Sequence, residues 1–330
     1  MANEVEKLNT IAIADIEKFN LLADSDIEKI NGFEFAGISG FAVFYGGNPG
    51  SVTNVSNLVS NLGVVASDTS GVGTARLGLC GTEYGGDKGI FVFGFDSGGN
   101  KIATSNLVDG SGVIGADVSG VGSIRGYPSA AGYSTNLGIL LFGTINSAPG
   151  YLGESNLVNS SGVVGSDVTA VASVKGHAGG TEYGGDKAIF AFGHDESAES
   201  NTRNLVSNSG VVASDASGAG TARRNLVAMT YGSGQSTAIF LAGDIDGTNT
   251  GVSNLVNSSG VVATDTTAVA TANYGAGGLE YGGDKAIMAF GTTADRTNDR
   301  NLISNSGVVG SNVSGAGTAR NELAGCGTGQ

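Results

Sequence analysis

Tryptophan is absent from this chain, and proline, cysteine and histidine are scarce, with three, two and two residues among 330. Histidine is the usual general base of enzymes, and neither His177 nor His194 stands in a recognisable motif with a serine or cysteine nucleophile. Cys80 and Cys326 lack the spacing of metal ligands, so we expect two small buried core residues, and nothing requires a disulfide between them. The sequence therefore predicts no catalytic, cofactor or metal site, and we expect a protein that is not an enzyme.

Positive charge is also in short supply. Sixteen lysines and arginines stand against 30 aspartates and glutamates, which gives a net charge of −14. Without a basic patch the chain is a poor partner for nucleic acid or an anionic membrane surface. No apolar run approaches the roughly 18 residues of a membrane span, and the first residues lack the basic start and apolar core of a signal peptide. We therefore expect no membrane insertion and synthesis in a cytoplasm without a signal peptide.

Glycine is the abundant residue, with 58 copies. Such a content suggests disorder when apolar residues are few, but here 40% of the residues are apolar and stand in short blocks rich in Val, Ile and Phe. We interpret the glycines as turn residues between many short strands, which predicts an all-β fold.

A unit that begins with Asn-Leu-Val, or a close variant, recurs six times with a spacing of 47 to 50 residues. Each copy continues with a glycine-containing turn and a pair of apolar residues. An Asp or Asn follows 11 residues after the anchor, and a basic residue follows after 19 in five of the six copies. A strand-rich repeat of this length predicts a propeller. The anchors are Asn57, Asn106, Asn156, Asn204, Asn254 and Asn301.

Each repeat reads as four strands, so six repeats predict a six-bladed, four-stranded β-propeller over residues 38–330. In the fourth repeat, for example, residues 187–193 form a continuous apolar run, as expected for a strand covered on both faces. The last residues, 320–330, match an inner strand without its partner, and residues 41–46 supply that partner. We expect the N- and C-terminal strands to pair and close the ring, which removes free sheet edges.

The first 37 residues carry a different repeat, in which Glu-Lys pairs flanked by apolar residues recur every 11 residues. Asp15 and Asp26 suit helix N-caps, so we expect a short helical segment of separate turns; an 11-residue period is also compatible with a continuous right-handed helical bundle. Isolated turns are unstable in water, so their apolar side must be buried against something. We therefore predict a docking segment at 1–37, with Ile16, Phe19, Ile27 and Ile30 as contact residues.

The repeated polar residues have two interpretations. The series Arg76, Arg125, Lys175, Arg223 and Arg320 could ring a central channel as an anion site, or tie adjacent blades together through carbonyl groups and the turn Asp of a neighbour. We favour the structural role, and likewise for the repeated aspartates. The motif Glu-Tyr-Gly-Gly-Asp-Lys occurs only in alternate repeats, at 83–88, 182–187 and 280–285, which gives a pseudo-threefold pattern.

Recognition is expected where the repeats differ. The loops between the second and third strands vary in sequence and should all emerge on one face, and loops on a rigid scaffold commonly carry recognition. Unselected surface drift explains the variation equally well. The polar residues that we single out in these loops are Asp96, Asn100, Asp195, Glu196, Asp244, Asp246, Asp295 and Asp299.

The apolar strand that ends in Phe-Gly, the loop of about ten residues, the third strand and the closing Arg resemble Kelch-type β-propellers over 38–330. The chain departs from that pattern, because the Kelch Gly-Gly doublet is mostly Phe-Gly here, as at Phe93-Gly94 and Phe290-Gly291, and the usual Trp is missing. The architecture therefore transfers better than a Kelch binding site. Together with the N-terminal Ile-Glu-Lys-Ile-Asn-Gly array, the repeats look like virion structural proteins of tailed bacteriophages, especially those from aquatic bacteria.

That resemblance implies a tail, fibre or capsid-surface protein located in the virion. The expected partners are other virion proteins bound through residues 1–37, other copies of the chain in a homo-oligomeric assembly, and a cell-surface glycan. The alternatives are a carbohydrate-binding or receptor-binding propeller and, since glycoside hydrolysis needs only two carboxylates, a propeller glycoside hydrolase.

Overall fold

The computed structural model describes residues 41–146, 150–169, 172–267 and 270–328, together with the backbone of seven short strands between Glu4 and Phe35. Contacts divide the chain into two compact units, Met1–Ser39 and Gly40–Gln330. No helix in the described part of the chain is long and apolar enough to cross a membrane.

Short strands form the described backbone of the first unit. The prediction of helical turns is wrong for these residues, because Lys18–Phe19 and Lys29–Ile30 were expected in such turns and are strands. Two residues separate the strands of each hairpin, and they begin with Asn in every copy. Asn, above all in Asn31-Gly32, favours the tight turn of a hairpin over helix continuation. The antiparallel pairs are β2 (Lys7–Leu8) with β3 (Ile11–Ala12), β4 (Lys18–Phe19) with β5 (Leu22–Ala23), and β6 (Lys29–Ile30) with β7 (Phe33–Phe35); β1 (Glu4–Val5) lies parallel to β7.

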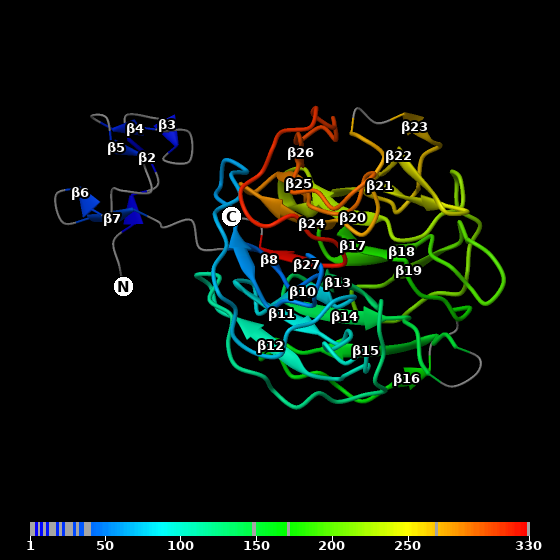
Figure 1. Cartoon of the computed structure of the whole chain (residues 1–330). Coiled ribbons are helices and arrows are strands. Elements are labelled where there is room, and N and C mark those ends of the chain that lie inside the picture. The colour runs from blue at the N-terminus through cyan, green and yellow to red at the C-terminus, as the bar shows by residue number, and fades with distance from the viewer. Residues whose placement is uncertain are drawn as a thin grey trace. The chain divides into compact units, whose positions relative to one another are not determined.

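The second unit consists of six antiparallel sheets of three or four strands (Figure 1). Glycine-rich turns join the short apolar strands, so each sheet is a meander in sequence order. The first sheet is the exception, because its strands come from both ends of the unit: the C-terminal β27 pairs with β8. The predicted pairing of N- and C-terminal strands is confirmed. In sheet order the strands are β27 (Ala324–Gly327), β8 (Ala42–Tyr45) and β9 (Ser56–Leu58); β10 (Cys80–Tyr84), β11 (Lys88–Val92) and β12 (Ser105–Val108); β13 (Ser129–Tyr133), β14 (Leu137–Leu141), β15 (Glu154–Val158) and β16 (Val168–Thr169); β17 (Gly179–Tyr183), β18 (Lys187–Ala191) and β19 (Arg203–Val206); β20 (Val227–Tyr231), β21 (Thr237–Ile245), β22 (Thr248–Val256) and β23 (Thr266–Thr267); and β24 (Gly277–Tyr281), β25 (Lys285–Ala289) and β26 (Arg300–Ile303).

Only some of the six sheets have the four strands that the sequence predicts. Two sheets have a fourth strand, β16 and β23, whereas in the other four the outer segment touches the third strand only at isolated bridges such as Val206–Val212 and Arg203–Ala216. The outer segments lie at a sheet edge and combine an exposed valine with glycine and serine, so few ladder hydrogen bonds form there. The prediction of a fourth strand is therefore wrong for those four sheets.

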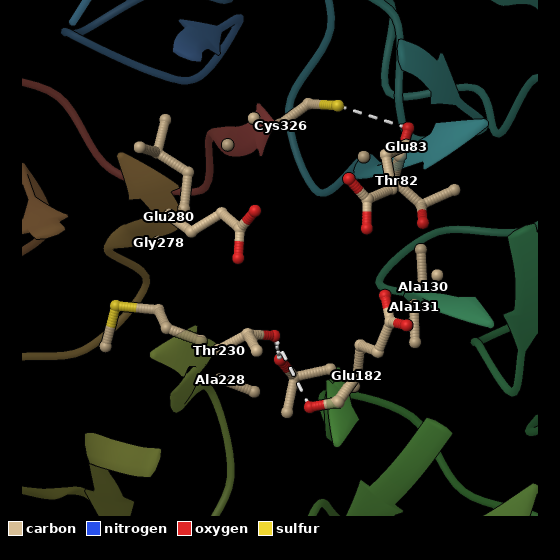
Figure 2. Close-up of a pocket in the computed structure, with 18 residues that line it drawn as sticks. Thr82, Glu83, Ala130, Ala131, Glu182, Ala228, Thr230, Gly278, Glu280 and Cys326 are labelled. Carbon is tan, nitrogen blue, oxygen red and sulfur yellow. Dashed lines mark hydrogen bonds between the residues drawn. The ribbon is translucent and has the colours of Figure 1, made fainter. Parts of the chain in front are cut away.

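The first strands of the six sheets, which we call the inner strands (β27, β10, β13, β17, β20 and β24), pack side by side in a closed ring. They can approach closely because small residues such as Ala130, Ala228 and Gly278 line the narrow channel between them (Figure 2). A methyl group added at Gly180 would stand 2.8 Å from the carbonyl oxygen of Ala130 on the neighbouring strand, so glycine is required there.

A cyclic set of six backbone hydrogen bonds closes this ring at one end of the inner strands. Each N–H donates to the carbonyl oxygen of the equivalent residue in the preceding sheet, over 2.7 to 3.2 Å, and the sixth bond returns to the first sheet. The ring is complete only because the C-terminal segment supplies one member. The six residues, which we call the ring residues, are Gly78, Tyr127, His177, Asn225, Gly275 and Glu322.

The apolar core lies between neighbouring sheets. The second strands are buried on both faces, as the continuous apolar runs predict: Ile189 and Phe190 in β18 have no exposed surface. Aromatic rings from adjacent sheets meet edge to face, for example Phe192 and Phe240 with centroids 5.3 Å apart. Burial of each such side chain contributes about 2–3 kcal/mol, so separation of two sheets would expose several of them at once.

The Phe-Gly pairs that end the second strands hold the backbone in an unusual conformation. Phe93, Phe142, Phe192 and Phe290 have φ between 62° and 67°, a region that glycine occupies more easily, and Gly46 stands at this position in the first sheet. A basic side chain packs over the ring of each phenylalanine: the Arg320 guanidinium lies 4.1 Å from the centroid of Phe290. Burial and this cation–π contact offset the backbone strain.

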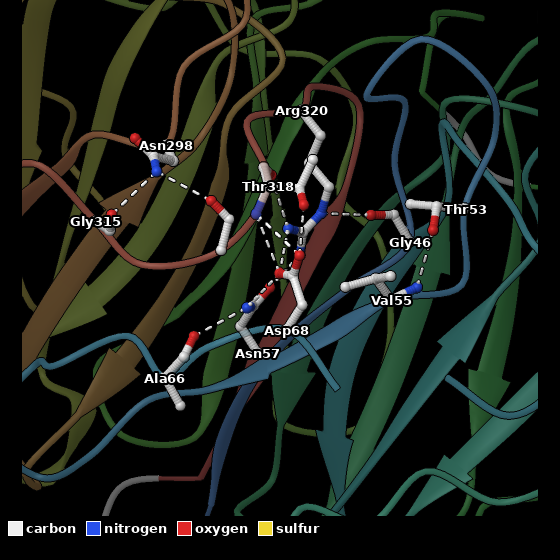
Figure 3. Close-up of polar contacts among 11 residues, drawn as sticks. Gly46, Thr53, Val55, Asn57, Ala66, Asp68, Asn298, Gly315, Thr318 and Arg320 are labelled. Atoms are coloured by element: carbon white, nitrogen blue, oxygen red, sulfur yellow. Dashed lines mark hydrogen bonds and ion pairs between the residues drawn. The ribbon is translucent and has the colours of Figure 1, made fainter. Parts of the chain in front are cut away.

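A polar network connects each sheet to the next, and Figure 3 shows the copy that joins the two ends of the unit. Arg320 donates from Nη2 to Asn57 Oδ1 at 2.6 Å and from Nε to the carbonyl of Gly46 at 2.8 Å. Asn57 donates to Asp68 at 2.9 Å, and Asp68 accepts bonds from the backbone and hydroxyl of Thr318. Arg320 is fully buried. The predicted structural role of the repeated Arg and Asp residues is confirmed.

The network predicts that an asparagine contributes more to stability where it accepts a bond from a buried basic residue. Asn57→Ala removes the acceptor of a buried guanidinium and should lower the free energy of unfolding by about 3 kcal/mol, measured by chemical denaturation. Asn301→Ala is the matched control, because Asn301 makes the equivalent bonds to Gly310 and Asn312 but receives none from Asn273, which replaces the basic residue. Equal losses in the two variants would show that the Arg–Asn bond contributes nothing.

Candidate functional site

The six variable loops and the ring residues lie at the same end of the inner strands. The residue before each ring residue pairs with a loop that follows a second strand, as in the bridges Leu77–Phe95, Gly176–His194 and Arg224–Asp244. The ring is therefore surrounded by the segments in which the repeats differ, and we call this end the loop face.

A pocket of about 90 Å³ opens on the loop face over the ring. Two ring residues are glycine, and the other four carry different side chains: Tyr127, His177, Asn225 and Glu322, all partly exposed. Pro128 and short apolar side chains complete the wall. The pocket thus combines an aromatic ring, an imidazole, an amide and a carboxyl group, each from a different sheet.

Three of these four side chains contact one another. The Tyr127 and His177 rings stack with centroids 4.0 Å apart, and His177 Nδ1 lies 2.6 Å from Asn225 Oδ1. Phe95 from a variable loop packs against the Tyr127 ring at 5.2 Å between centroids. The arrangement leaves the groups fixed in position, as a binding site requires.

The backbone at these positions is strained. Tyr127, His177, Asn225 and Glu322 have φ between 48° and 58°, and the equivalent Gly78 and Gly275 have φ of 58° and 62°. A side chain other than glycine costs about 1–2 kcal/mol in this region, and such residues gather at functional sites. The ring therefore tolerates four unfavourable residues in positions where glycine would fit.

Burial changes the ionisation of the pocket. Desolvation lowers the pKa of His177 to about 4, with the charges of Arg224 and His194 acting in the same direction, so the imidazole is neutral at pH 7. Burial also raises the pKa of Glu322, although Tyr127 and Arg296 act against it, and raises the pKa of Tyr127. The pocket thus presents hydrogen-bonding groups with little positive charge.

Three loop residues that the sequence suggested, Asp96, Asn100 and Asp195, form hydrogen bonds within their own loops. Asp96 accepts bonds from the backbone of Gly98 and Asn100, and Asp195 accepts bonds from Ser197 and Ala198. Such local turns stabilise loop shape.

The remaining suggested loop residues differ in exposure. Asp244 is buried and accepts a bond from Arg224 Nε at 3.2 Å, which also lies 3.5 Å from Glu199. Asp299 takes part in its loop through its backbone, by bonds with Phe290 and Thr297. The side chains of Glu196, Asp246 and Asp295 are exposed around the pocket's face.

The predicted docking residues are not brought into any described contact. Ile16 and Ile27 lie outside the described residues, and Phe19 and Ile30 belong to β4 and β6, of which only the backbone is described. Their docking role stays a hypothesis. Cys80 and Cys326 are buried and free, which confirms the expectation of core residues.

Sequence reasoning missed three of the four pocket side chains. It noted His177 only as a histidine without a nucleophile partner, whereas His177 lies just before β17 and lines the pocket. The available signal was the position two residues after the basic residue of each repeat, or after Asn273 in the repeat that lacks one, which reads Gly, Tyr, His, Asn, Gly and Glu. Variation at one fixed position of an otherwise regular repeat marks the site.

No protein-family model matches this chain, and no curated protein matches it in sequence. The site is therefore interpreted from its own residues.

The strain at the ring makes a prediction about stability. Glu322→Gly should unfold with a free energy about 1 kcal/mol higher than Glu322→Ala, because only glycine occupies φ near 56° without cost. Thermal or chemical denaturation measures the difference. The same pair of substitutions at the exposed Glu196 is the control, and there alanine should be the more stable. If Glu322→Ala also has the higher free energy of unfolding of its pair, the backbone at this ring position is not strained.

Proposed function

We propose that this chain is a non-enzymatic virion structural protein whose loop face recognises the terminal sugar of a cell-surface glycan. The observation that supports this most directly is the set of four unlike, strained side chains at equivalent positions of the ring. A scaffold function alone is met by glycine at these positions, as Gly78 and Gly275 demonstrate. Four costly residues gathered around one pocket are better explained by a ligand.

The six sheets are, in this proposal, the blades of a six-bladed propeller of the Kelch type. The closed ring of inner strands, the completion of the first sheet by both termini and the glycine doublet Gly46-Gly47 support it. The fold leaves function open, so the argument for recognition depends on the pocket.

The size and chemistry of the pocket favour the end of a larger ligand. A volume of about 90 Å³ is well below the roughly 300–1,000 Å³ of pockets that enclose a whole ligand. Asn225, His177 and Glu322 offer both donors and acceptors, which suits a group with several hydroxyls. The rest of the glycan would lie over the variable loops.

The pocket does not favour hydrolysis. Cleavage of a glycosidic bond normally uses two carboxyl groups on either side of the bond, and Glu322 is the only carboxyl residue among those that line this pocket. His177 is held by Asn225, and no serine, threonine or cysteine lines the described pocket as a nucleophile beside it. We therefore keep the proposal of a binding protein.

The assembly part of the proposal concerns residues 1–37. Their three short hairpins repeat every 11 residues, and hairpins of this length are stable only when their apolar side is covered. Other virion proteins or further copies of this chain would provide that cover, with the six-sheet unit displayed outward on a tail, fibre or capsid surface.

Glycan binding tests the proposed recognition of a glycan by the loop face. The full chain should bind a subset of a glycan array, and Tyr127→Gly and Asn225→Gly should each weaken that binding by at least about tenfold, since each removes a direct contact. Glycine avoids a folding defect because it already occupies two ring positions. Asp87→Asn, in a turn between β10 and β11 at the other end of the inner strand, is the control and should bind normally. Unchanged binding in both ring variants contradicts the proposed site.

Deletion of residues 1–37 tests the proposed role of this segment in assembly. The shortened chain should unfold cooperatively, because the ring is closed within the remaining residues, but it should be lost from purified virus particles. Mass spectrometry of particles measures incorporation, with full-length Tyr127→Gly as the control that should still be incorporated. Normal incorporation of the shortened chain would sink the docking hypothesis.

A further inference from the structure

Three glutamates stand around the channel at the end of the inner strands opposite the loop face. Glu83, Glu182 and Glu280 each lie five residues after a ring residue, in β10, β17 and β24. Figure 2 shows their carboxyl groups directed toward the space between the strands. The intervening sheets carry Gly132, Thr230 and Gly327 at this position, so carboxyl groups alternate with small residues.

The space in front of Gly132 is shared by two of the carboxyl groups. A methyl group on Gly132 would stand 2.8 Å from Glu182 Oε2 and 2.8 Å from Glu83 Oε1. The third carboxyl group is linked to them through Gln235, whose Nε2 donates to Glu280 at 2.8 Å and to Glu83 at 3.1 Å. The three groups therefore converge on one region of the channel.

Glu182 has no hydrogen-bond donor for its carboxyl group among the described residues. Its side chain is 3% exposed, and neither carboxyl oxygen accepts a hydrogen bond from the described residues. A buried acceptor without a partner costs about 1–3 kcal/mol, and more when it is charged. No Lys or Arg of the described chain forms an ion pair with any of the three glutamates. The cluster thus lacks a positive charge.

We propose that this axial cluster binds a divalent cation, with Ca²⁺ as the expected ion. The available ligands are all oxygen atoms, which calcium prefers, and calcium accepts irregular mixtures of carboxylate, amide and water ligands. The cavity of about 70 Å³ has room for several water molecules. Water is needed, because in the described part of the chain no three His, Cys, Asp or Glu side chains are placed to hold a metal ion by themselves.

The bound ion would connect three alternate sheets at the axis. The Oε1 atom of Gln235 could join the shell after rotation of the amide, since nitrogen and oxygen of this group exchange places easily. The pseudo-threefold recurrence of Glu-Tyr-Gly-Gly-Asp-Lys then acquires a chemical reason, because its glutamates place three carboxyl groups around the channel, where they would bind the ion directly or through water.

Calcium titration of the chelator-treated full chain at neutral pH tests the proposal. We expect one saturable site by isothermal titration calorimetry and a rise in melting temperature of about 4 °C when calcium is in hundredfold excess over its dissociation constant. A chain that shows neither heat of binding nor a shift at millimolar calcium overturns the proposal, and the cluster then holds protons alone.

Variants assign the site. Glu182→Gln and Glu280→Gln keep the shape of the side chain and should each weaken calcium binding at least about tenfold, since each removes a charged ligand. Asp87→Asn is the matched control, because its carboxyl group is nearly half exposed and bonds to Lys88 outside the channel. Binding that survives in both glutamine variants, or is lost in the control, overturns the assignment. Calorimetry on the unaltered chain decides whether an ion binds, so this part of the test does not depend on whether a variant folds.

Discussion

None of the six sheets can bury its own apolar residues, because each is only three or four strands wide and its second strand requires cover on both faces. Phe190 in β18, for example, has no exposed surface and owes this to the sheets on either side. An open row of such sheets would leave two apolar faces in water. The constraint is met by closing the row into a ring, so the pairing of β27 with β8 matters to every other sheet.

Closure also explains the unfavourable local conformations that the fold contains. The phenylalanines at the ends of the second strands adopt positive φ, and a fully buried basic side chain lies over each ring. Either feature alone would destabilise the protein, since a buried charge without acceptors is costly. Each guanidinium, however, finds carbonyl or amide oxygens, as Arg223 does at Ala242, and the aromatic ring fills the space beside it. Strain and buried charge are thus offset by contacts between neighbouring repeats.

The two ends of the inner strands carry different patterns of side chains on the same backbone framework. At the loop face the six copies diverge, and the pocket contains four unlike side chains. At the opposite end three copies agree, and they place glutamates symmetrically around the channel. A ring of similar sheets can therefore carry an asymmetric recognition site and a pseudo-threefold charge cluster within one short channel, because successive residues of an inner strand face different surroundings.

The amino-acid sequence by itself determined the number of repeats, the all-β class, the sharing of the first sheet between both termini and the structural role of Arg320 and Asp68. These follow from periodicity and from the local chemistry of glycine turns and apolar runs. The prediction of helical turns in the N-terminal segment was wrong. It relied on the 11-residue spacing and gave too little weight to the Asn that opens the two residues between the strands of each hairpin. Only the tertiary structure decided that Tyr127, His177, Asn225 and Glu322 share a pocket and that Gln235 bridges Glu83 and Glu280. The groups in contact are 45 or more residues apart along the chain, and the packing of the sheets around one channel is what brings them together.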